Sequence, residues 1–368
     1  MAKQVSFRDA HEYLNKLLAH LARFEGGSDL HLQANQPPAF RIDGRLRRSS
    51  YPPLSEAEIQ TMAMSIMNEA QRKRFIAERD IDLSYEVPGV ARFRVNVYFQ
   101  RGKVGAAFRL IPLRVRTIDE LGLPQILKEL ALKPRGFILV TGPTGSGKST
   151  TLAAMIEHMN TNVRKHVITI EDPIEFSFED KMCVIEQREV EIDTSSFAAA
   201  LKHIMRQNPD VIMIGEMRDL ETISLALSAA EMGNLVLATL HTRTAYQTVD
   251  RIIDVFPAEQ QAQVRLQLST SLTAVLSQTL VPLASGHGRM AAFEILICNA
   301  AVRNAIREGK PHQIPSLIQS GSQEGMILMD AFLEQLVLSR KVKYEDVIYK
   351  VADPKRFEES CGFMRGRV

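Results

Sequence analysis

Strand-like apolar runs and helical patterns alternate through the middle of the chain. The apolar runs lie at residues 137–141, 167–170, 211–214 and 235–240, and the helical segments begin at residue 148 and lie near 197–206 and 221–231. A continuous apolar run predicts a strand buried on both faces, and this order of elements predicts a largely parallel sheet with helices packed on it. After about Ala291 the pattern predicts mainly helices.

The first part of the chain, to about Pro112, predicts a smaller α/β unit. The expected elements are a first amphipathic helix, strands at residues 29–33, 39–42 and 91–100, and a helix that runs from a capping box at Ser55 and Glu58 to about Glu78. The second strand ends in Asp43-Gly44, which is a strong hairpin turn signal. A partner strand is expected to follow the third and to end at Pro112.

Composition and charge narrow the class of protein. A length of 368 residues suggests two or three domains, and 45% hydrophobic with 24% charged residues is typical of a globular chain. The net charge of +2 gives no overall field toward nucleic acid or an acidic membrane, so neither nucleic-acid binding nor membrane insertion is expected. Cys183, Cys298 and Cys361 are dispersed, which excludes a CxxC zinc site and suits a reducing cytosol.

Two further observations concern membrane segments. The N-terminus lacks the basic and apolar regions of a signal peptide. The longest uncharged stretch, residues 266–288, contains too many Ser, Thr and Gln residues to cross a bilayer. Any membrane link is therefore expected to come through a partner.

The strongest chemical signal is a phosphate-binding loop between the first apolar run and its helix. Residues 142–149 match GxxxxGK[ST], in which backbone N–H groups and a helix N-terminus surround phosphate oxygens. Lys148 is expected to neutralise the β- and γ-phosphates of ATP, and Ser149 to bind Mg²⁺. The alternative is a tight turn without nucleotide. The expected nucleotide-binding residues are Gly142, Thr144, Gly145, Ser146, Gly147, Lys148, Ser149 and Thr150.

Polar residues follow the other apolar runs, at the edge where α/β sheets bind ligands. Glu216 is expected to orient or deprotonate the attacking water and to support Mg²⁺ through a water molecule, unless it only caps a helix. Glu171, Asp172 and Glu175 could polarise the water, or they form a proline turn with solvated charges. His241 could contact the γ-phosphate, or it is an ordinary hydrogen-bonded histidine.

Three arginines in the first unit are candidates for a second phosphate contact. Arg94, Arg101 and Arg109 could reach the nucleotide of a neighbouring subunit as arginine fingers. The alternative is a solvated polar face of a sheet, where charges are usual.

Over nearly the whole chain these residues resemble the secretion-type ATPases of type IV pili, in the PilT/PilU retraction branch. The matching segments are residues 28–32, 37–38 and 92–96 in the first unit, the Walker A loop at 142–150, the Asp box at 169–175, the Walker B segment at 215–219 and the His box at 239–242. The resemblance implies a PAS-like α/β domain at 1–112, a linker at 113–133, a RecA-like P-loop ATPase core at 134–300 and a helical C-terminal part at 301–368.

The resemblance also implies a function. It implies a cytoplasmic homohexamer at the inner-membrane base of the pilus that hydrolyses ATP with Mg²⁺ to depolymerise pilin. An inner-membrane platform protein and a paralogous retraction ATPase are the implied partners. Glu175, Glu216 and His241 are the implied catalytic residues, and Arg94 and Arg109 the implied phosphate contacts.

Residues 301–308 resemble the AIRNLIRE motif of retraction motors, with departures at Val302 and Ala305. We expect Val302, Ala305 and Ile306 to form the apolar face and Arg303, Asn304 and Arg307 to stay free, although a plain amphipathic helix would have the same pattern.

Some segments favour a different paralogue or a different class. Residues 206–207 and 344–346 look more like PilU, and Asn208 stands where an acid is usual. The rival classes are an assembly or type II secretion ATPase, which usually carries a four-cysteine zinc element, a nucleotide-bound regulatory subunit, and a DNA-translocating ring.

Overall fold

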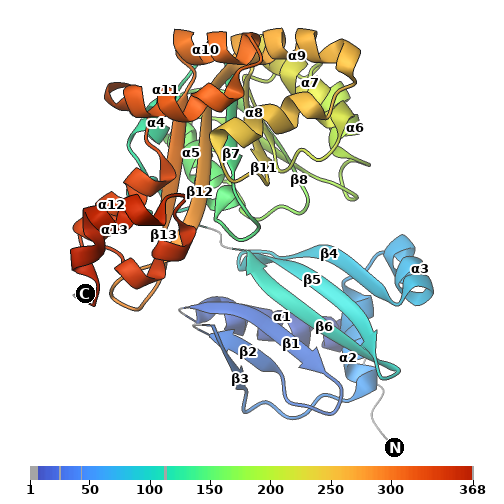
Figure 1. The fold of residues 1–368 in the computed structure, drawn as a ribbon. Coiled ribbons are helices and arrows are strands. Elements are labelled where there is room, and N and C mark those ends of the chain that lie inside the picture. The colour runs from blue at the N-terminus through green and yellow to red at the C-terminus, as the bar shows by residue number, and fades with distance from the viewer. Residues whose placement is uncertain (1–6, 25, 43, 112–113, 367–368) are drawn as a thin grey trace, which may run out of the picture. The chain divides into compact units, whose positions relative to one another are not determined.

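The computed structural model describes residues 7–366 apart from residues 25, 43, 112 and 113. The chain divides into two compact units, residues 1–114 with 175–177, and residues 115–174 with 178–368 (Figure 1). Asp43 of the predicted turn and Pro112 of the predicted strand end lie outside the described residues. Among the described residues, no helix combines the length and the apolarity that crossing a membrane requires.

The first unit is a six-stranded antiparallel sheet with helices packed on one face. The strand order is β3-β2-β1-β6-β5-β4. The elements are α1 (Phe7–Arg23), β1 (Gly27–Gln33), β2 (Ala39–Ile42), β3 (Arg45–Arg48), α2 (Glu56–Ser65), α3 (Glu69–Glu78), β4 (Asp80–Val87), β5 (Ala91–Gln100) and β6 (Lys103–Ile111). Leu14 and Leu18 of α1 are fully buried in one core with Leu30, Phe93 and Phe108 of the sheet.

Two strands of this unit match their predicted bounds, and one predicted helix is wrong in its length. Ser55 and Glu58 form the predicted capping box at the start of α2, but α2 ends at Ser65. A second capping box then starts α3, because the Asn68 side chain accepts a hydrogen bond from the Gln71 N–H and the Gln71 side chain accepts one from Asn68. This local pairing competes with a continuous helix.

The second unit contains a seven-stranded sheet of order β13-β12-β7-β11-β10-β8-β9, in which β12 and β13 pair antiparallel and the other neighbours pair parallel. Its elements are α4 (Ile126–Ala131), β7 (Gly136–Thr141), α5 (Lys148–Asn162), β8 (His166–Glu171), β9 (Val184–Glu189), α6 (Phe197–Ile204), β10 (Val211–Ile214), α7 (Leu220–Glu231), β11 (Leu235–Leu240), α8 (Ala245–Asp254), α9 (Ala258–Ser271), β12 (Leu272–Pro282), β13 (Arg289–Ile297), α10 (Ala300–Arg307), α11 (Ile314–Ser320), α12 (Met329–Leu338) and α13 (Pro354–Cys361), with 3-10 turns η1 (Pro311–Gln313), η2 (Ser322–Glu324), η3 (Tyr344–Asp346), η4 (Ile348–Lys350) and η5 (Gly362–Met364).

Helices cover both faces of this sheet. On β7, Phe137 and Leu139 point into a core shared with α6 to α11, whereas Ile138 and Val140 point into a second core shared with α4 and α5. The far ends of β12 and β13 pack on α12 and α13 in a third cluster. The predicted α/β class, with a largely parallel sheet between helical layers, is confirmed. The division into four segments at residues 112, 133 and 300 stays a prediction.

Three strands of this sheet were not predicted. The expectation of mainly helical structure after about Ala291 is wrong up to Ile297, because β13 occupies Arg289–Ile297 and pairs with β12. β12 contains buried Ser277 and Gln278, which interrupt its apolar pattern. β9 is the edge strand and contains mostly polar residues, so it does not show the buried pattern of its neighbours.

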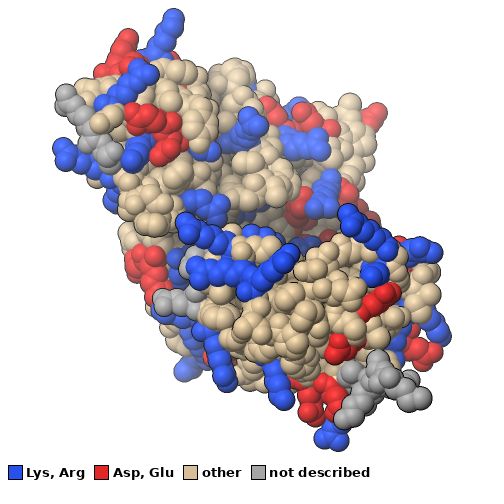
Figure 2. All heavy atoms as spheres, turned by 90° about the horizontal axis from the view of Figure 1, so that it is seen from below, with Lys and Arg blue, Asp and Glu red and all other residues tan. Residues whose placement is uncertain are grey.

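Asn208 has a backbone φ of 52°, in the left-handed region that asparagine tolerates better than most residues. This conformation gives a physical account of the residue type at a turn between α6 and β10. On the face shown in Figure 2, Lys and Arg side chains lie in several groups, with smaller groups of Asp and Glu side chains beside them.

Candidate functional site

The phosphate-binding loop connects β7 to α5. Gly142 has a φ of 141°, and a Cβ there would lie 2.2 Å from the backbone oxygen of Gln278. Gly147, the N-cap of α5, has a φ of 89°. Both positions therefore require glycine, the first for space and both for conformation.

The predicted nucleotide-binding residues lie together in this loop and in the first turn of α5. The Lys148 Nζ donates to the carbonyl oxygens of Gly142, at 2.9 Å, and Pro143, at 3.3 Å, so the ammonium group lies over the loop. Ser149 and Thr150 are half-buried at the start of α5. A helix start presents N–H groups that have no partner within the helix, together with the positive end of the helix dipole, and both favour phosphate binding at this loop.

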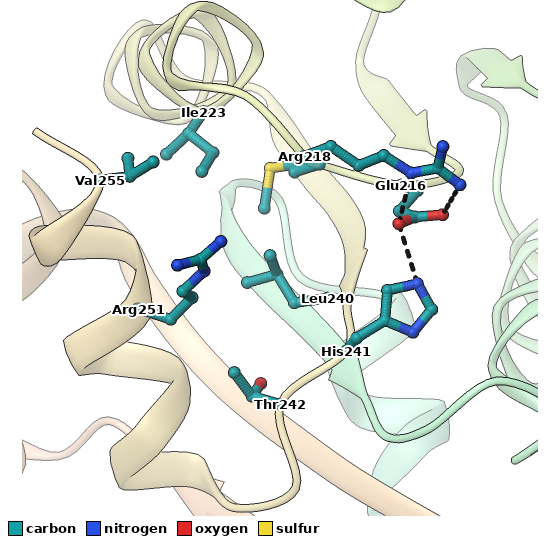
Figure 3. A pocket seen from close by; sticks show the side chains of 9 residues that line it. Glu216, Arg218, Ile223, Leu240, His241, Thr242, Arg251 and Val255 are labelled. Carbon is teal, nitrogen blue, oxygen red and sulfur yellow. Dashed lines mark hydrogen bonds and ion pairs between the residues drawn. The ribbon is translucent and has the colours of Figure 1, made fainter.

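Glu216 and His241 meet at the carboxyl edge of the sheet. Glu216 follows β10 and His241 follows β11, and these strands pair parallel. The Glu216 Oε1 lies 2.8 Å from the His241 Nε2 and 2.7 Å from the Arg218 Nε, and its Oε2 lies 2.8 Å from an Arg218 terminal nitrogen (Figure 3). The sequence predicted the edge that Glu216 and His241 share but not the two-point contact with Arg218.

The surroundings of Glu216 favour its carboxylate form. The hydrogen bond from Arg218, together with the electrostatic interactions with His241 and Arg218, lowers the pKa of Glu216, although partial burial opposes this. The side chain is 20% exposed, so it can meet water from one side. A carboxylate held in this way is better suited to orienting a water molecule than to taking its proton.

A pocket of about 260 Å³ adjoins this cluster (Figure 3). Its walls are Glu216, Met217, Arg218, Ile223, Leu240, His241, Thr242, Arg251 and Val255. Arg251 comes from α8 and projects into the pocket in Figure 3. Sequence reasoning missed it, because an arginine on an amphipathic helix carries no signal of its own.

The acids of the Asp box differ in their surroundings. Glu171 ends β8 and is buried, and its Oε1 accepts hydrogen bonds from the Thr169 Oγ1 at 2.6 Å and the Gln187 Nε2 at 3.1 Å. Glu175 is exposed and lies in residues 175–177, which group with the first unit. The catalytic role of Glu175 stays a prediction.

In the first unit, Arg94 and Arg109 stand directly opposite each other on β5 and β6. Arg109 is also opposite Asp29 on β1, and its Nε donates to the Asp29 Oδ1 at 2.8 Å. Arg41, opposite Asp29 on β2, places its Nε 3.4 Å from the Asp29 Oδ2. Three arginines therefore form one row across four strands, and the buried Asp29 carboxylate orients two of them, Arg41 and Arg109. Arg101 lies in the turn after β5 with a φ of 50°.

Replacing Asp29 by Asn is expected to destabilise this row. Burial alone would raise the pKa of Asp29, but hydrogen bonds from Ser28 and Arg109 and the charge of Arg109 lower it below 3.8. A lowered pKa means that the carboxylate contributes stability above the unfolded-state value and loses it only as pH falls through the folded value. Because Arg109 is exposed, we expect a loss of about 1 kcal/mol in unfolding free energy.

Urea unfolding of the full chain measures this loss, with Asp82→Asn on β4, the edge strand of the same sheet, as the matched control. The loss of unfolding free energy in Asp29→Asn should not become smaller between pH 7 and pH 5, because both pH values lie above the ordinary Asp pKa of 3.8. A loss of unfolding free energy that is smaller at pH 5 than at pH 7 would contradict the lowered pKa of Asp29.

The retraction-motif segment differs from its prediction. Val302, Ala305 and Ile306 are buried on α10, as expected. Arg303, however, is not free, because its guanidinium donates to the carbonyl oxygens of Ser269 and Thr270, each at 2.7 Å. These carbonyls end α9 and need partners from outside the helix. Asn304 and Arg307 are exposed, as expected, and their hydrogen bonds are local, since Asn304 donates to Glu308 and accepts from Arg307.

Comparison with known proteins decides the family. The family model described as "Type II/IV secretion system protein" matches residues 4–312. This chain belongs to that family. It is 51% identical to the "Type IV pilus retractation ATPase PilT" of Pseudomonas aeruginosa, over 94% of this chain and 99% of that relative. It is 43% identical to the "Type IV pilus ATPase PilU" of the same organism, over 88% of this chain and 85% of that relative.

A solved structure leads to the same family. The crystal structure of "the Pilus Retraction Motor PilT and Bound ADP" superposes with a TM-score of 0.87 at 46% identity, covering 94% of this chain and 99% of that one. This member of the type II/IV secretion system family is therefore a P-loop ATPase with an N-terminal domain and a RecA-like motor. The resemblance to the PilT/PilU branch is confirmed.

Proposed function

We propose that this chain is a Mg²⁺-dependent ATPase that forms a hexameric ring and powers type IV pilus retraction. One observation carries the chemical part: the P-loop, His241 and Glu216 follow the adjacent parallel strands β7, β11 and β10, so all three lie at one carboxyl edge. The likeness to PilT over 94% of the chain supports the mechanical part.

Each residue at this edge has a part in hydrolysis. Backbone N–H groups of the phosphate-binding loop, such as that of Gly147, bind the phosphates, and Lys148 neutralises the β- and γ-oxygens. Glu216 orients the attacking water, and His241 holds the Glu216 carboxylate in place through its 2.8 Å contact. Fixed donors of this kind stabilise the charge that develops as the terminal phosphate leaves.

The residues present suit Mg²⁺. The Ser149 hydroxyl and, through water, the Glu216 carboxylate are oxygen donors, which are the ligands that Mg²⁺ prefers. When bound, the ion neutralises charge on the β- and γ-phosphates. Ser149 lies in the first turn of α5, where the loop delivers the phosphates.

The first unit completes the motor. In this proposal Arg94 and Arg109 reach the phosphates of a nucleotide on a neighbouring subunit. Arg41 and Arg109 share the Asp29 carboxylate, which orients Arg109. Loss of the γ-phosphate then changes which arrangement of the two units is stable, and this change drives the stroke. The ring works in the cytoplasm at the inner-membrane base of the pilus, against a platform protein, and a paralogous retraction ATPase is a second partner.

The test of this function combines activity, mass and motility. We expect the purified chain to release phosphate from ATP only with Mg²⁺, to have the mass of six subunits with ATP, and to restore twitching in a strain lacking its own retraction ATPases. A chain that binds ATP without turnover would indicate the regulatory-subunit alternative. Turnover that restores twitching only beside a PilT-like partner would indicate a PilU-like accessory ATPase, which the 43% identity keeps as the second candidate.

A further inference from the structure

β12 continues alongside the phosphate-binding loop after its neighbour β7 has ended. The two strands pair parallel, with Ser277 opposite Thr141, the last residue of β7. Their hydroxyl oxygens lie 2.8 Å apart and both side chains are fully buried. The next residue of β12, Gln278, therefore lies directly beside the loop.

Gln278 contacts the loop near both of its ends. Its side-chain Nε2 donates to the carbonyl oxygen of Ser146 at 2.7 Å. Its own backbone oxygen lies against Gly142, where a Cβ would come within 2.2 Å, and a Cβ at Gly147 would come within 3.2 Å of the Nε2. Gln278 is 2% exposed, so these contacts are shielded from water.

The direction of the Ser146 carbonyl matters for phosphate binding. A P-loop binds phosphate through N–H groups, and a carbonyl oxygen turned toward the phosphate would bring two negative charges together. The Gln278 amide holds the Ser146 carbonyl toward β12. In a trans peptide the carbonyl and the N–H point in opposite directions, so the N–H of Gly147 is thereby turned away from β12 and left for the ligand.

Burying a polar side chain with an unpaired oxygen costs free energy of folding, which argues against a role of Gln278 in packing alone. The Gln278 Oε1 is buried without a hydrogen-bond partner, as is the Oγ of Ser146. An apolar side chain of similar volume would fill the same space and remove the unpaired Oε1, at the expense of the donor to the Ser146 carbonyl. Unsatisfied buried groups in native proteins call for a functional reason. The donor to Ser146 supplies that reason.

We propose that Gln278 is a positioning residue of the nucleotide site, which shapes the phosphate-binding loop from the neighbouring strand. The proposal rests on nucleotide binding at residues 142–150. Gln278 lies more than a hundred residues after the GxxxxGK[ST] motif in the chain, so the motif itself gives no indication of this residue.

The test compares Gln278→Leu with wild type in the full chain, using Mg-ADP as the probe and isothermal titration as the measurement. We expect the affinity for Mg-ADP to fall about tenfold, the factor that the net worth of one hydrogen bond implies. The melting temperature without nucleotide should stay close to wild type, because Gln278→Leu removes the unpaired Oε1 together with the hydrogen bond to Ser146. If Gln278 serves only the fold, Gln278→Leu should lower the melting temperature and leave the affinity for Mg-ADP unchanged.

Gln278→Met is the second variant, and Gln267→Leu is the matched control, because the Gln267 amide donates to Glu231 on the surface, away from the loop. Unchanged Mg-ADP affinity in both Gln278 variants would overturn the proposal, and so would failure of both to fold. If wild type itself does not bind Mg-ADP, the proposed function fails; if wild type binds and the variants bind equally, only the positioning role fails.

Discussion

Lys148→Ala is expected to lower steady-state ATP turnover by about 10²- to 10³-fold, the range seen when one preorganised charge-stabilising donor is removed from an active site. The Lys148 ammonium lies 2.9 Å from the carbonyl oxygen of Gly142, at the mouth of the loop. It is the cation that the motif places against the β- and γ-phosphates. Its loss removes charge stabilisation and an internal brace of the loop.

Phosphate release with saturating Mg-ATP measures this effect, and fluorescent-nucleotide binding separates it from lost affinity. Lys202→Ala is the matched control, because Lys202 on α6 pairs with Glu221 on the protein surface. The control should hydrolyse ATP at the wild-type rate. Turnover of Lys148→Ala within a few-fold of the control would place hydrolysis at another site.

Glu216→Gln is expected to separate ATP binding from hydrolysis. The amide has nearly the same shape but no charge, so it loses the carboxylate that orients the attacking water. We expect turnover to fall by about 10²- to 10⁴-fold, the range for a positioned acid or base, while ATP affinity stays close to wild type. Because the pKa of Glu216 is lowered, the wild-type carboxylate is ionised at neutral pH, and this loss should not depend on pH there.

Single-turnover hydrolysis and equilibrium ATP binding together test this separation. Glu221→Gln, five residues further along, makes the same substitution at an exposed site and should leave both quantities unchanged. An equal loss of binding and hydrolysis in Glu216→Gln would mean that Glu216 shapes the nucleotide pocket rather than the water. In that case the Arg218 and His241 contacts would be its main role.

Local sequence patterns predicted those elements in which residues of a single type, such as apolar residues, follow one another in the chain. β10 and β11 have the predicted bounds because all of their residues are apolar and buried, so burial on both faces leaves a continuous signal. The loop at 142–149 was readable because glycines and Lys148 must stand at fixed spacing to surround phosphate. The shared edge of Glu216 and His241 followed from the parallel order of strands.

Features that depend on contacts with residues far away in the chain could not be predicted from the sequence. β12 was missed because Ser277 and Gln278 are polar, and their burial makes sense only beside Thr141 and Ser146. Arg303 was expected to be free because the carbonyls that it caps belong to α9, more than thirty residues earlier.

By itself, the sequence determined the α/β class, the order of the motor strands and the phosphate-binding loop, since each depends on residue types at short, regular spacing. Only the tertiary structure decided which side chains support that site: Gln278 behind the loop, Arg218 on Glu216, and Asp29 behind Arg109. These contacts join residues whose spacing in the chain follows no rule, because the fold and not the local backbone brings their atoms within hydrogen-bond distance.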